Sequence, residues 1–194
     1  MKEIVIASKN EHKIIEISNI LTPLGYKVLS LFDFDDFPEI IEDGNTFKEN
    51  ALIKARTLAI HLNKTVIADD SGLEVFALDN EPGIYSARYA GENKNYNDNN
   101  ELLLKNLKKI ENRKARFVTS MCVYYMDKEP IFVEDYLYGE ISKEYVGENG
   151  FGYDPIFYIP HLNKNLAELS LEEKNQISHR ALCLKQLIKY LIKK

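Results

Sequence analysis

The chain has few of the residues and patterns that mark several large protein classes. Its two cysteines, Cys122 and Cys183, form no CxxC pair and suggest neither a disulfide framework nor a zinc site. No apolar run approaches the length of a membrane span. The strand-like pattern at residues 2–7 leaves no room for a signal peptide. We therefore expect a soluble, cytoplasmic protein with no membrane partner.

The chain also lacks a positive net charge and the best-known hydrolase signatures. The net charge is -5 and the pI is near 5.5, which argues against nucleic acid as a partner because that binding needs a basic surface. The sequence has no GxxxxGK[ST] loop and no HExxH motif. These absences exclude the hydrolase classes that the two motifs define.

The composition is that of a globular protein with a sizeable core. The 194 residues are 45% hydrophobic with a mean hydropathy of -0.32, which predicts one domain, residues 1–194. Strand-like and helix-like patterns alternate, which predicts an α/β fold with a mixed sheet. The expected strands are residues 2–7, 27–31, 65–69, 73–77, 116–125 and 131–141, the last two as a hairpin-like pair. The expected helices are residues 11–24, 47–62, 96–110 and 171–193, the last broken near Ser178.

The most informative segment is Asp69-Asp70-Ser71-Gly72, which follows the apolar run 66–68. This order predicts a strand that ends in a tight turn, with both acids at its carboxyl end, where open α/β sheets bind ligands. Two such acids can hold a divalent cation or orient a water molecule. Ordinary turn chemistry and helix capping explain the same residues, so the segment alone leaves both interpretations open.

Three further segments carry polar groups in positions suited to a nucleotide. Ser8, Asn10 and Lys13 stand where a predicted strand gives way to a helix, and a helix N-terminus attracts phosphate. Residues 149–155 form a glycine-rich loop that carries an aromatic ring and an acid. Residues 174–180 are dense in hydrogen-bond donors. Each segment alone is a weak signal.

In this order and spacing, the segments closely resemble the inosine triphosphate pyrophosphatase family, also called Ham1-like or non-canonical purine NTP pyrophosphatases. The resemblance runs from residue 4 to about residue 190. The matching blocks are residues 7–10 with Lys13, then 43–51, 68–91, 150–157, 167–170 and 174–181. One departure is Asn165-Leu166, where the family usually has Thr followed by an aromatic residue. We expect this change to affect loop packing and not activity.

The resemblance implies a fold and a reaction. The implied fold is an elongated mixed β-sheet flanked by helices, in two lobes with a central active-site cleft. The implied reaction is Mg²⁺-dependent hydrolysis of non-canonical purine nucleoside triphosphates (ITP, dITP and XTP) to the monophosphate and pyrophosphate, which cleanses the nucleotide pool. The family also implies a homodimer.

The resemblance assigns the chemistry to three acids. Asp70 corresponds to the catalytic acid-base residue, and Glu49, Asp69 and Asp70 are the expected metal ligands, because Mg²⁺ prefers carboxylates plus phosphate oxygens. Glu49 has a competing role, since the pattern Thr46 to Glu49 fits a capping box. The pattern alone favours capping over metal binding for Glu49, whereas the resemblance favours metal binding.

Other side chains are suited to the triphosphate. The expected phosphate-binding residues are Ser8, Asn10, Lys13, Ser71 and Lys174, of which the lysines act as point charges. For Lys54 we favour a solvated helix face over a phosphate contact. The acidic stretch from Asp33 to Asp43 is expected to be a solvated loop, with metal binding by Glu42 or Asp43 as the minority alternative.

The base is expected to be recognised by a loop and by the start of the last helix. The residues are Phe151, Asp154, His179 and Arg180, and Gly152 and Tyr153 of the same loop are further expected substrate contacts. Phe151 stands between two glycines and has space to stack, although a lone Phe is more often part of a core. His179 and Arg180 offer donors to a 6-oxo purine, whereas adenine would present a donor to them. Hypoxanthine and xanthine are therefore favoured.

Two other classes of protein would share part of these motifs. A non-catalytic nucleotide-binding module would keep the phosphate and base residues but lose the acids, so the presence of Glu49, Asp69 and Asp70 argues against it. A structural protein whose motifs are only turns and caps is disfavoured by the number and order of the matching blocks.

Overall fold

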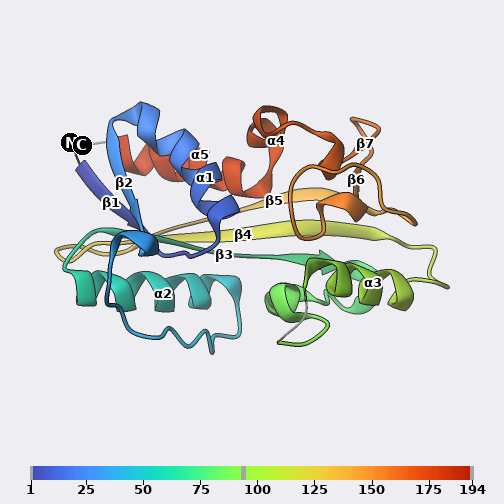
Figure 1. The fold of residues 1–194 in the computed structure, drawn as a ribbon, viewed down its shortest axis with the longest axis horizontal. Coiled ribbons are helices and arrows are strands. Elements are labelled where there is room, and N and C mark those ends of the chain that lie inside the picture. The colour runs from blue at the N-terminus through green and yellow to red at the C-terminus, as the bar shows by residue number, and fades with distance from the viewer. Residues whose placement is uncertain (1, 93–94, 193–194) are drawn as a thin grey trace. The chain divides into compact units, whose positions relative to one another are not determined.

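The computed structural model describes residues 2–92 and 95–192, which form an α/β fold with one mixed sheet (Figure 1). The strand order is β2-β1-β3-β4-β5-β6-β7. The strands are β1 (Lys2–Ile6), β2 (Tyr26–Ser30), β3 (Val66–Val75), β4 (Lys114–Tyr124), β5 (Ile131–Ile141), β6 (Phe157–Ile159) and β7 (Lys164–Asn165). β1 pairs in parallel with β2 and β3, whereas β6 pairs antiparallel with β5 and β7. The predicted α/β class is confirmed.

The helices follow the predicted order closely. They are α1 (Glu11–Leu21), α2 (Phe47–Leu62), α3 (Tyr96–Asn106), α4 (Leu171–Ile177) and α5 (His179–Ile192). Short 3₁₀ turns are η1 (Thr22–Leu24), η2 (Leu31–Asp33), η3 (Phe76–Leu78), η4 (Gly83–Arg88), η5 (Asp154–Ile156) and η6 (Leu166–Glu168). The expected range of α2 is confirmed at both ends. The last predicted helix divides at Ser178 as expected, and residue 193 lies outside the described residues.

The start of α4 shows how local chemistry fixes a helix boundary. Ser170 Oγ accepts a hydrogen bond from the Glu173 backbone N–H at 3.2 Å, and Glu173 Oε2 accepts one from the Ser170 N–H at 2.8 Å. This reciprocal arrangement is a capping box, which satisfies two backbone donors that the first turn leaves free. The Ser-x-x-Glu pattern therefore places the helix start from sequence alone.

The tight turn expected at Ser71-Gly72 is wrong. β3 runs without a break from Val66 to Val75, and Gly72 is not among the glycines with positive φ. The strand lies between β1 and β4, and residues 66–70 are all buried. Among the described residues, β1 pairs with β3 only at Val66 and Ile67, so we attribute the continuation through residues 69–72 to pairing with β4 and to burial, which outweigh the weak strand preference of Asp, Ser and Gly. The two acids therefore lie in the middle of a strand and not at its end.

The chain divides into two compact units. Unit 1 comprises the residues up to Asp70, Thr119–Asp135 and the residues from Arg180 onward; unit 2 comprises Ser71–Val118 and Tyr136–His179. β3, β4 and β5 each contribute residues to both units. The predicted cleft between two lobes stays a prediction, as does the single-domain assignment.

In unit 1, helices cover both faces of the sheet. α1 and α5 lie on one face and α2 lies on the other (Figure 1). Ile17 of α1 and Leu184 of α5 belong to one apolar cluster, whereas Ala55 and Leu58 of α2 belong to another. Side chains that alternate along β1 and β3 are thus buried on both sides.

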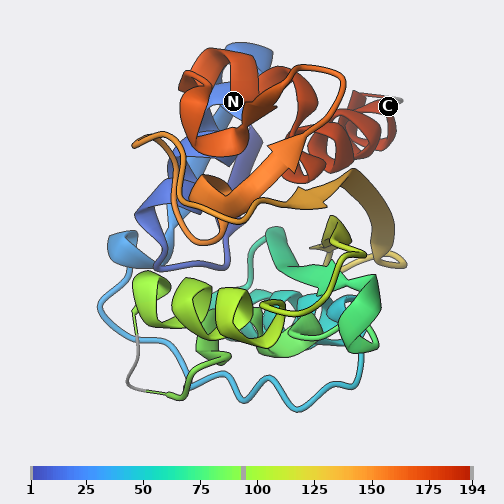
Figure 2. The ribbon, with the colours of Figure 1, turned by 90° about the vertical axis from the view of Figure 1, so that its right-hand side faces the viewer.

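Unit 2 has a single apolar core. Figure 2 shows α3 and α4 on opposite sides of the strands in this part of the sheet. Leu103 of α3 and Leu107, which caps the end of that helix, share a cluster with Phe157 of β6 and Leu73 of β3. This core fixes the loop that precedes η5, where the base-binding residues were predicted. Among the described residues, no helix is long and apolar enough to cross a membrane.

Candidate functional site

Asp69 and Asp70 are consecutive residues in the middle of β3, so their side chains point to opposite faces of the sheet. Both are buried, with exposed fractions of 3% and 9%. Each face carries different helices of unit 1, and the two carboxylates therefore meet different partners. Two acids that are adjacent in sequence occupy separate environments.

On the face covered by α1 and α5, Asp69 lies between two cations. Lys13 Nζ is 2.9 Å from Asp69 Oδ2, and Arg180 Nε donates to the same oxygen at 3.3 Å. Arg180 also donates to Glu16, a second buried carboxylate on α1. Asn10 caps α1 by accepting a hydrogen bond from the Lys13 backbone N–H. The helix cap and two ion pairs hold Asp69 in place.

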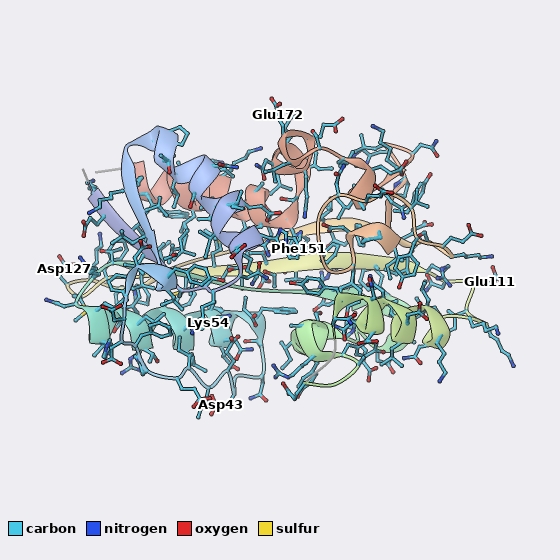
Figure 3. The ribbon with its side chains drawn as sticks, in the orientation of Figure 1. Asp43, Lys54, Glu111, Asp127, Phe151 and Glu172 are labelled. Atoms are coloured by element: carbon cyan, nitrogen blue, oxygen red, sulfur yellow. The ribbon has the colours of Figure 1, made fainter. Side chains whose placement is uncertain are left out.

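On the opposite face, Asp70 meets polar side chains of α2. Asn50 Nδ2 donates to Asp70 Oδ2 at 3.0 Å, and Lys54 Nζ donates to Asp70 Oδ1 at 3.4 Å. Lys54 also binds Glu42 Oε2 at 2.8 Å, and Asn50 Oδ1 accepts the Gly44 N–H at 2.9 Å. The segment before α2 is thus tied to the surroundings of Asp70. Figure 3 marks Lys54 on α2.

Lys54 is buried, so the solvated helix face that we expected for it is wrong. Its exposed fraction is 7%. Lys54 stands four residues after Asn50 and shares the helix face that meets β3, and two carboxylates compensate its charge there. Glu42 is half-buried, which differs from the solvated loop that we predicted for its segment. The other acids of the segment are exposed as predicted.

The surroundings shift the pKa of three groups, Asp70, Lys54 and Lys13. Burial raises the pKa of Asp70 above its ordinary value, and the opposing charges of Lys54 and Lys13 reduce that rise. For Lys54, burial works against the charged form, but the carboxylates of Asp70 and Glu42 outweigh it and raise its pKa. For Lys13, burial wins over the attraction of Asp69 and lowers the pKa. A carboxylate with a raised pKa is well suited to accept a proton.

Glu49 makes the contacts of a helix cap. Its backbone N–H donates to Thr46 Oγ1 at 3.1 Å, and its Oε2 accepts the Asn45 N–H at 2.7 Å. The second bond goes to the residue before the N-cap, a variation on the predicted capping box. The Glu49 side chain is exposed. Capping and metal binding are compatible here, because one carboxylate has more than one acceptor position.

Metal binding by Glu49, Asp69 and Asp70 stays a prediction. In the described part of the chain, no group of three or more His, Cys, Asp or Glu side chains is placed to hold a metal ion. Mg²⁺ does not require such a group, since it often takes one or two carboxylates and substrate phosphate oxygens. Asp70 fits that mode better than Asp69, because Asp69 already bridges Lys13 and Arg180.

The two predicted phosphate-binding hydroxyls belong to Ser8, in the turn before α1, and to Ser71, which follows Asp70 in β3. Ser8 Oγ accepts the Asn10 N–H at 3.0 Å in the turn that leads into α1. Ser71 is half-buried in β3 directly after Asp70. Neither position excludes a phosphate contact, and the predicted role of both residues stays a prediction.

In unit 2, the loop before η5 brings three predicted residues together. Asp154 Oδ2 accepts hydrogen bonds from the Phe151 N–H at 2.8 Å and from Lys174 Nζ at 2.7 Å. The Lys174 ammonium lies 4.6 Å from the centre of the Phe151 ring. Phe151, marked in Figure 3, is half-buried and lies outside the apolar core, with the Tyr96 ring 6.1 Å away. The core role considered for Phe151 is therefore wrong.

Gly150 makes this loop possible. Its φ is +79°, and a Cβ at this position would lie 2.0 Å from Asp154 Oδ2. The left-handed conformation and the close carboxylate both require glycine. The glycine-rich sequence thus serves the approach of Asp154 to the Phe151 N–H.

The remaining predicted substrate-binding residues have other partners. The His179 ring stacks on Phe117, with centroids 4.7 Å apart and planes 7° from parallel. Tyr153 belongs to the apolar core, and its hydroxyl donates to the Ser86 carbonyl at 2.8 Å. Arg180 is held by Asp69 and a second carboxylate, as described above. Substrate contacts by these three residues stay predictions.

Sequence analysis missed two buried polar partners near the acids, Glu16 and Asn50, and two buried asparagines of α3, Asn99 and Asn100. A signal existed for two of them. Glu16 follows Lys13 by three residues and Asn50 precedes Lys54 by four, spacings that share a helix face. For Asn100 no such signal exists, because its partner is the Gly152 carbonyl, 52 residues further along the chain.

Comparison with known proteins gives a consistent result. The model of the Ham1 family matches residues 4–190. A Bacillus licheniformis protein named dITP/XTP pyrophosphatase is 50% identical over 189 residues, which cover 96% of each chain. The solved structure of the Staphylococcus aureus Ham1 protein is 49% identical, with a TM-score of 0.89 and 98% coverage of both chains. A HAM1 protein from Coxiella burnetii is 40% identical, with a TM-score of 0.92 and 100% coverage of both chains.

Proposed function

Because this chain belongs to the Ham1 family, we propose that it hydrolyses non-canonical purine nucleoside triphosphates to the monophosphate and pyrophosphate. The proposed substrates are ITP, dITP and XTP. The observation that carries the proposal is the buried Asp70 with its raised pKa, held by Asn50 and Lys54. The similarity to relatives named dITP/XTP pyrophosphatase supports it.

In unit 1, Asp70 is the proposed general base. Its carboxylate would accept the proton of the attacking water, a role that its raised pKa favours. Asn50 fixes one carboxylate oxygen, which leaves the orientation of the group defined. The Lys54 ammonium, 3.4 Å from the other oxygen, is placed to stabilise negative charge that develops on a phosphate nearby.

Mg²⁺ is the proposed cofactor, with Asp70 and Glu49 as its carboxylate ligands. The donor set fits, because hard cations select anionic oxygen and Glu49 is exposed. The bound ion would neutralise phosphate charge during the reaction. Asp69 is better assigned to holding Lys13 and Arg180 than to direct ligation.

In unit 2, the Phe151 loop is the proposed element of base recognition. The half-buried Phe151 ring can stack on a purine, and Asp154 and Lys174 form a fixed polar pair beside it. The Lys174 ammonium is a hydrogen-bond donor beside the Phe151 ring, which makes it a candidate partner for a 6-oxo group. This chemistry favours hypoxanthine and xanthine over adenine.

We further propose a cytoplasmic homodimer, which the family resemblance supports. Sedimentation velocity at several protein concentrations tests the assembly. A dimer at micromolar concentration is expected, and a monomer throughout would contradict it.

The test of the proposed activity is turnover of ITP with Mg²⁺ and with EDTA, beside ATP as the comparison substrate. We expect ITP to turn over faster than ATP, and EDTA to abolish activity. A protein that binds ITP without turnover would instead be the non-catalytic module considered above.

A further inference from the structure

Two neighbouring asparagines on α3, Asn99 and Asn100, are equally buried. They differ in how many of their side-chain polar atoms have a hydrogen-bond partner. Each has an exposed fraction of 1%. Asn99 Oδ1 accepts the Ala90 N–H at 2.7 Å, and its Nδ2 donates to the Ala87 carbonyl at 3.1 Å. Asn99 therefore uses both ends of its amide to fix the turn after η4.

Asn100 uses only one end of its amide. Its Nδ2 donates to the Gly152 carbonyl at 3.0 Å, while its Oδ1 is buried with no hydrogen-bond partner among the described residues. A buried carbonyl without a partner costs stability, and an apolar side chain of similar size would avoid that cost. Stability alone therefore does not explain an amide at this position, and the bond to Gly152 is the contact that it provides.

Gly152 stands in the middle of the loop that carries the proposed base-binding groups. It follows Phe151 and precedes Tyr153 and Asp154, and its φ of +64° sets the direction of the chain there. Apart from its two chain neighbours, no described residue has an atom within 4 Å of the position of a Cβ on Gly152, so this side of the residue is open. The Asn100 bond is a direct restraint on its peptide group.

Asn165 is a second buried amide that binds the far end of the loop, and its side chain has no unpaired buried atom among the described residues. Asn165 Nδ2 donates to the Pro155 carbonyl at 2.7 Å and to Ser142 Oγ at 3.0 Å. Its backbone N–H donates to Glu168 Oε2 at 2.6 Å, and among the described residues its side-chain oxygen is not a buried atom without a partner. Asn165 thus has a structural explanation that Asn100 lacks.

We propose that Asn100 is a positioning residue: its hydrogen bond to the Gly152 carbonyl holds the loop that presents Phe151 and Asp154 to the purine base. Asn100 acts through the loop and does not touch the substrate. The inference rests on the proposed function for its kinetic consequence. Its structural consequence, a restrained loop, is independent of that function.

The test compares Asn100→Leu with the matched control Asn99→Leu. Asn100→Leu removes one hydrogen bond together with a buried unpaired carbonyl, so the melting temperature should stay close to that of the parent. KM for ITP should rise roughly three- to tenfold, the equivalent of one lost hydrogen bond, with kcat nearly unchanged. Asn99→Leu should lower the melting temperature and leave KM unchanged.

A second measurement keeps the test independent of catalysis. Hydrogen–deuterium exchange of residues 151–156 should be faster in Asn100→Leu than in the parent, and unchanged in Asn99→Leu. Asn100→Asp, which keeps the volume but sets an oxygen against the Gly152 carbonyl, should give the same result if the Leu variant folds poorly. Unchanged exchange and unchanged KM in a folded Asn100 variant would overturn the inference. Absence of ITP turnover in the parent would overturn the proposed function, and exchange would still decide the role of Asn100.

Discussion

The two faces of β3 show how the same residue type acquires different chemistry. Asp69 faces two cations, Lys13 and Arg180, and is fixed by both. Asp70 faces an amide and one lysine, and burial raises its pKa. A carboxylate between two cations is fixed in place by two ion pairs, whereas a carboxylate with one cation and a raised pKa can exchange a proton. We therefore expect Asp69 to stabilise the fold and Asp70 to take part in the reaction.

The largest expected effect follows from Asp70→Asn. Loss of a general base costs about 10²–10⁴-fold in turnover, and loss of a metal ligand would add to that. The fold should survive, because Asn keeps the volume and an acceptor for Asn50. Turnover of ITP beside a circular dichroism spectrum checks both points. Turnover within a few-fold of the parent would remove Asp70 from the reaction.

Asp69→Asn should act mainly on stability. Removing one partner of a buried ion pair costs about 3 kcal/mol, because Lys13 and Arg180 would keep buried charges with less compensation. For a protein of this size the melting temperature should fall by roughly 6–12 °C. Turnover below the melting transition should fall much less than in Asp70→Asn. Equal loss of turnover in both variants, with no change in melting, would erase the distinction between the two faces.

Lys54→Met should shift the pH dependence of turnover. Burial raises the pKa of Asp70 and Lys54 opposes that rise, so removing the lysine should raise the pKa further. Since the ionised carboxylate is the active form, turnover is lost as the pH falls through this pKa, and the loss should begin at a higher pH in the variant. The measurement is kcat/KM for ITP against pH. An acidic limb that stays in place or moves to lower pH would show that Lys54 does not control Asp70.

The smallest change in fold and stability is expected for Glu49→Gln. Gln is an accepted capping-box partner, so the helix cap and the melting temperature should stay nearly unchanged. If Glu49 binds Mg²⁺, loss of its charge should lower activity and raise the Mg²⁺ concentration needed for half-maximal turnover. A Mg²⁺ titration beside a thermal melt tests this. An unchanged midpoint with turnover like that of the parent would leave Glu49 with the cap alone.

Features controlled by nearby residues were predictable from the sequence. The apolar spacing of α2 gave both of its ends, and the Ser170 pattern gave the start of α4. The Phe151 loop was identified from its glycines and its acid. These features depend on partners within a few residues, which a sequence displays directly.

Features controlled by distant residues could not be predicted from the sequence. Nothing near Asp69 indicates that β3 continues through Gly72, because that depends on the distant strand β4 beside it in the sheet. The burial of Lys54 needs a carboxylate from the loop before α2 and another from β3. The Arg180–Glu16 contact joins residues 164 positions apart. Such partners are brought together only by the fold.

The products of ITP hydrolysis test the central claim most directly. Attack at the α-phosphorus with Asp70 as base gives the monophosphate and pyrophosphate, so anion-exchange separation of the parent enzyme's products should show these two in equal amounts. Their appearance should be lost in Asp70→Asn and retained in Asp69→Asn below its melting transition. Inosine diphosphate with orthophosphate as the products would contradict the account.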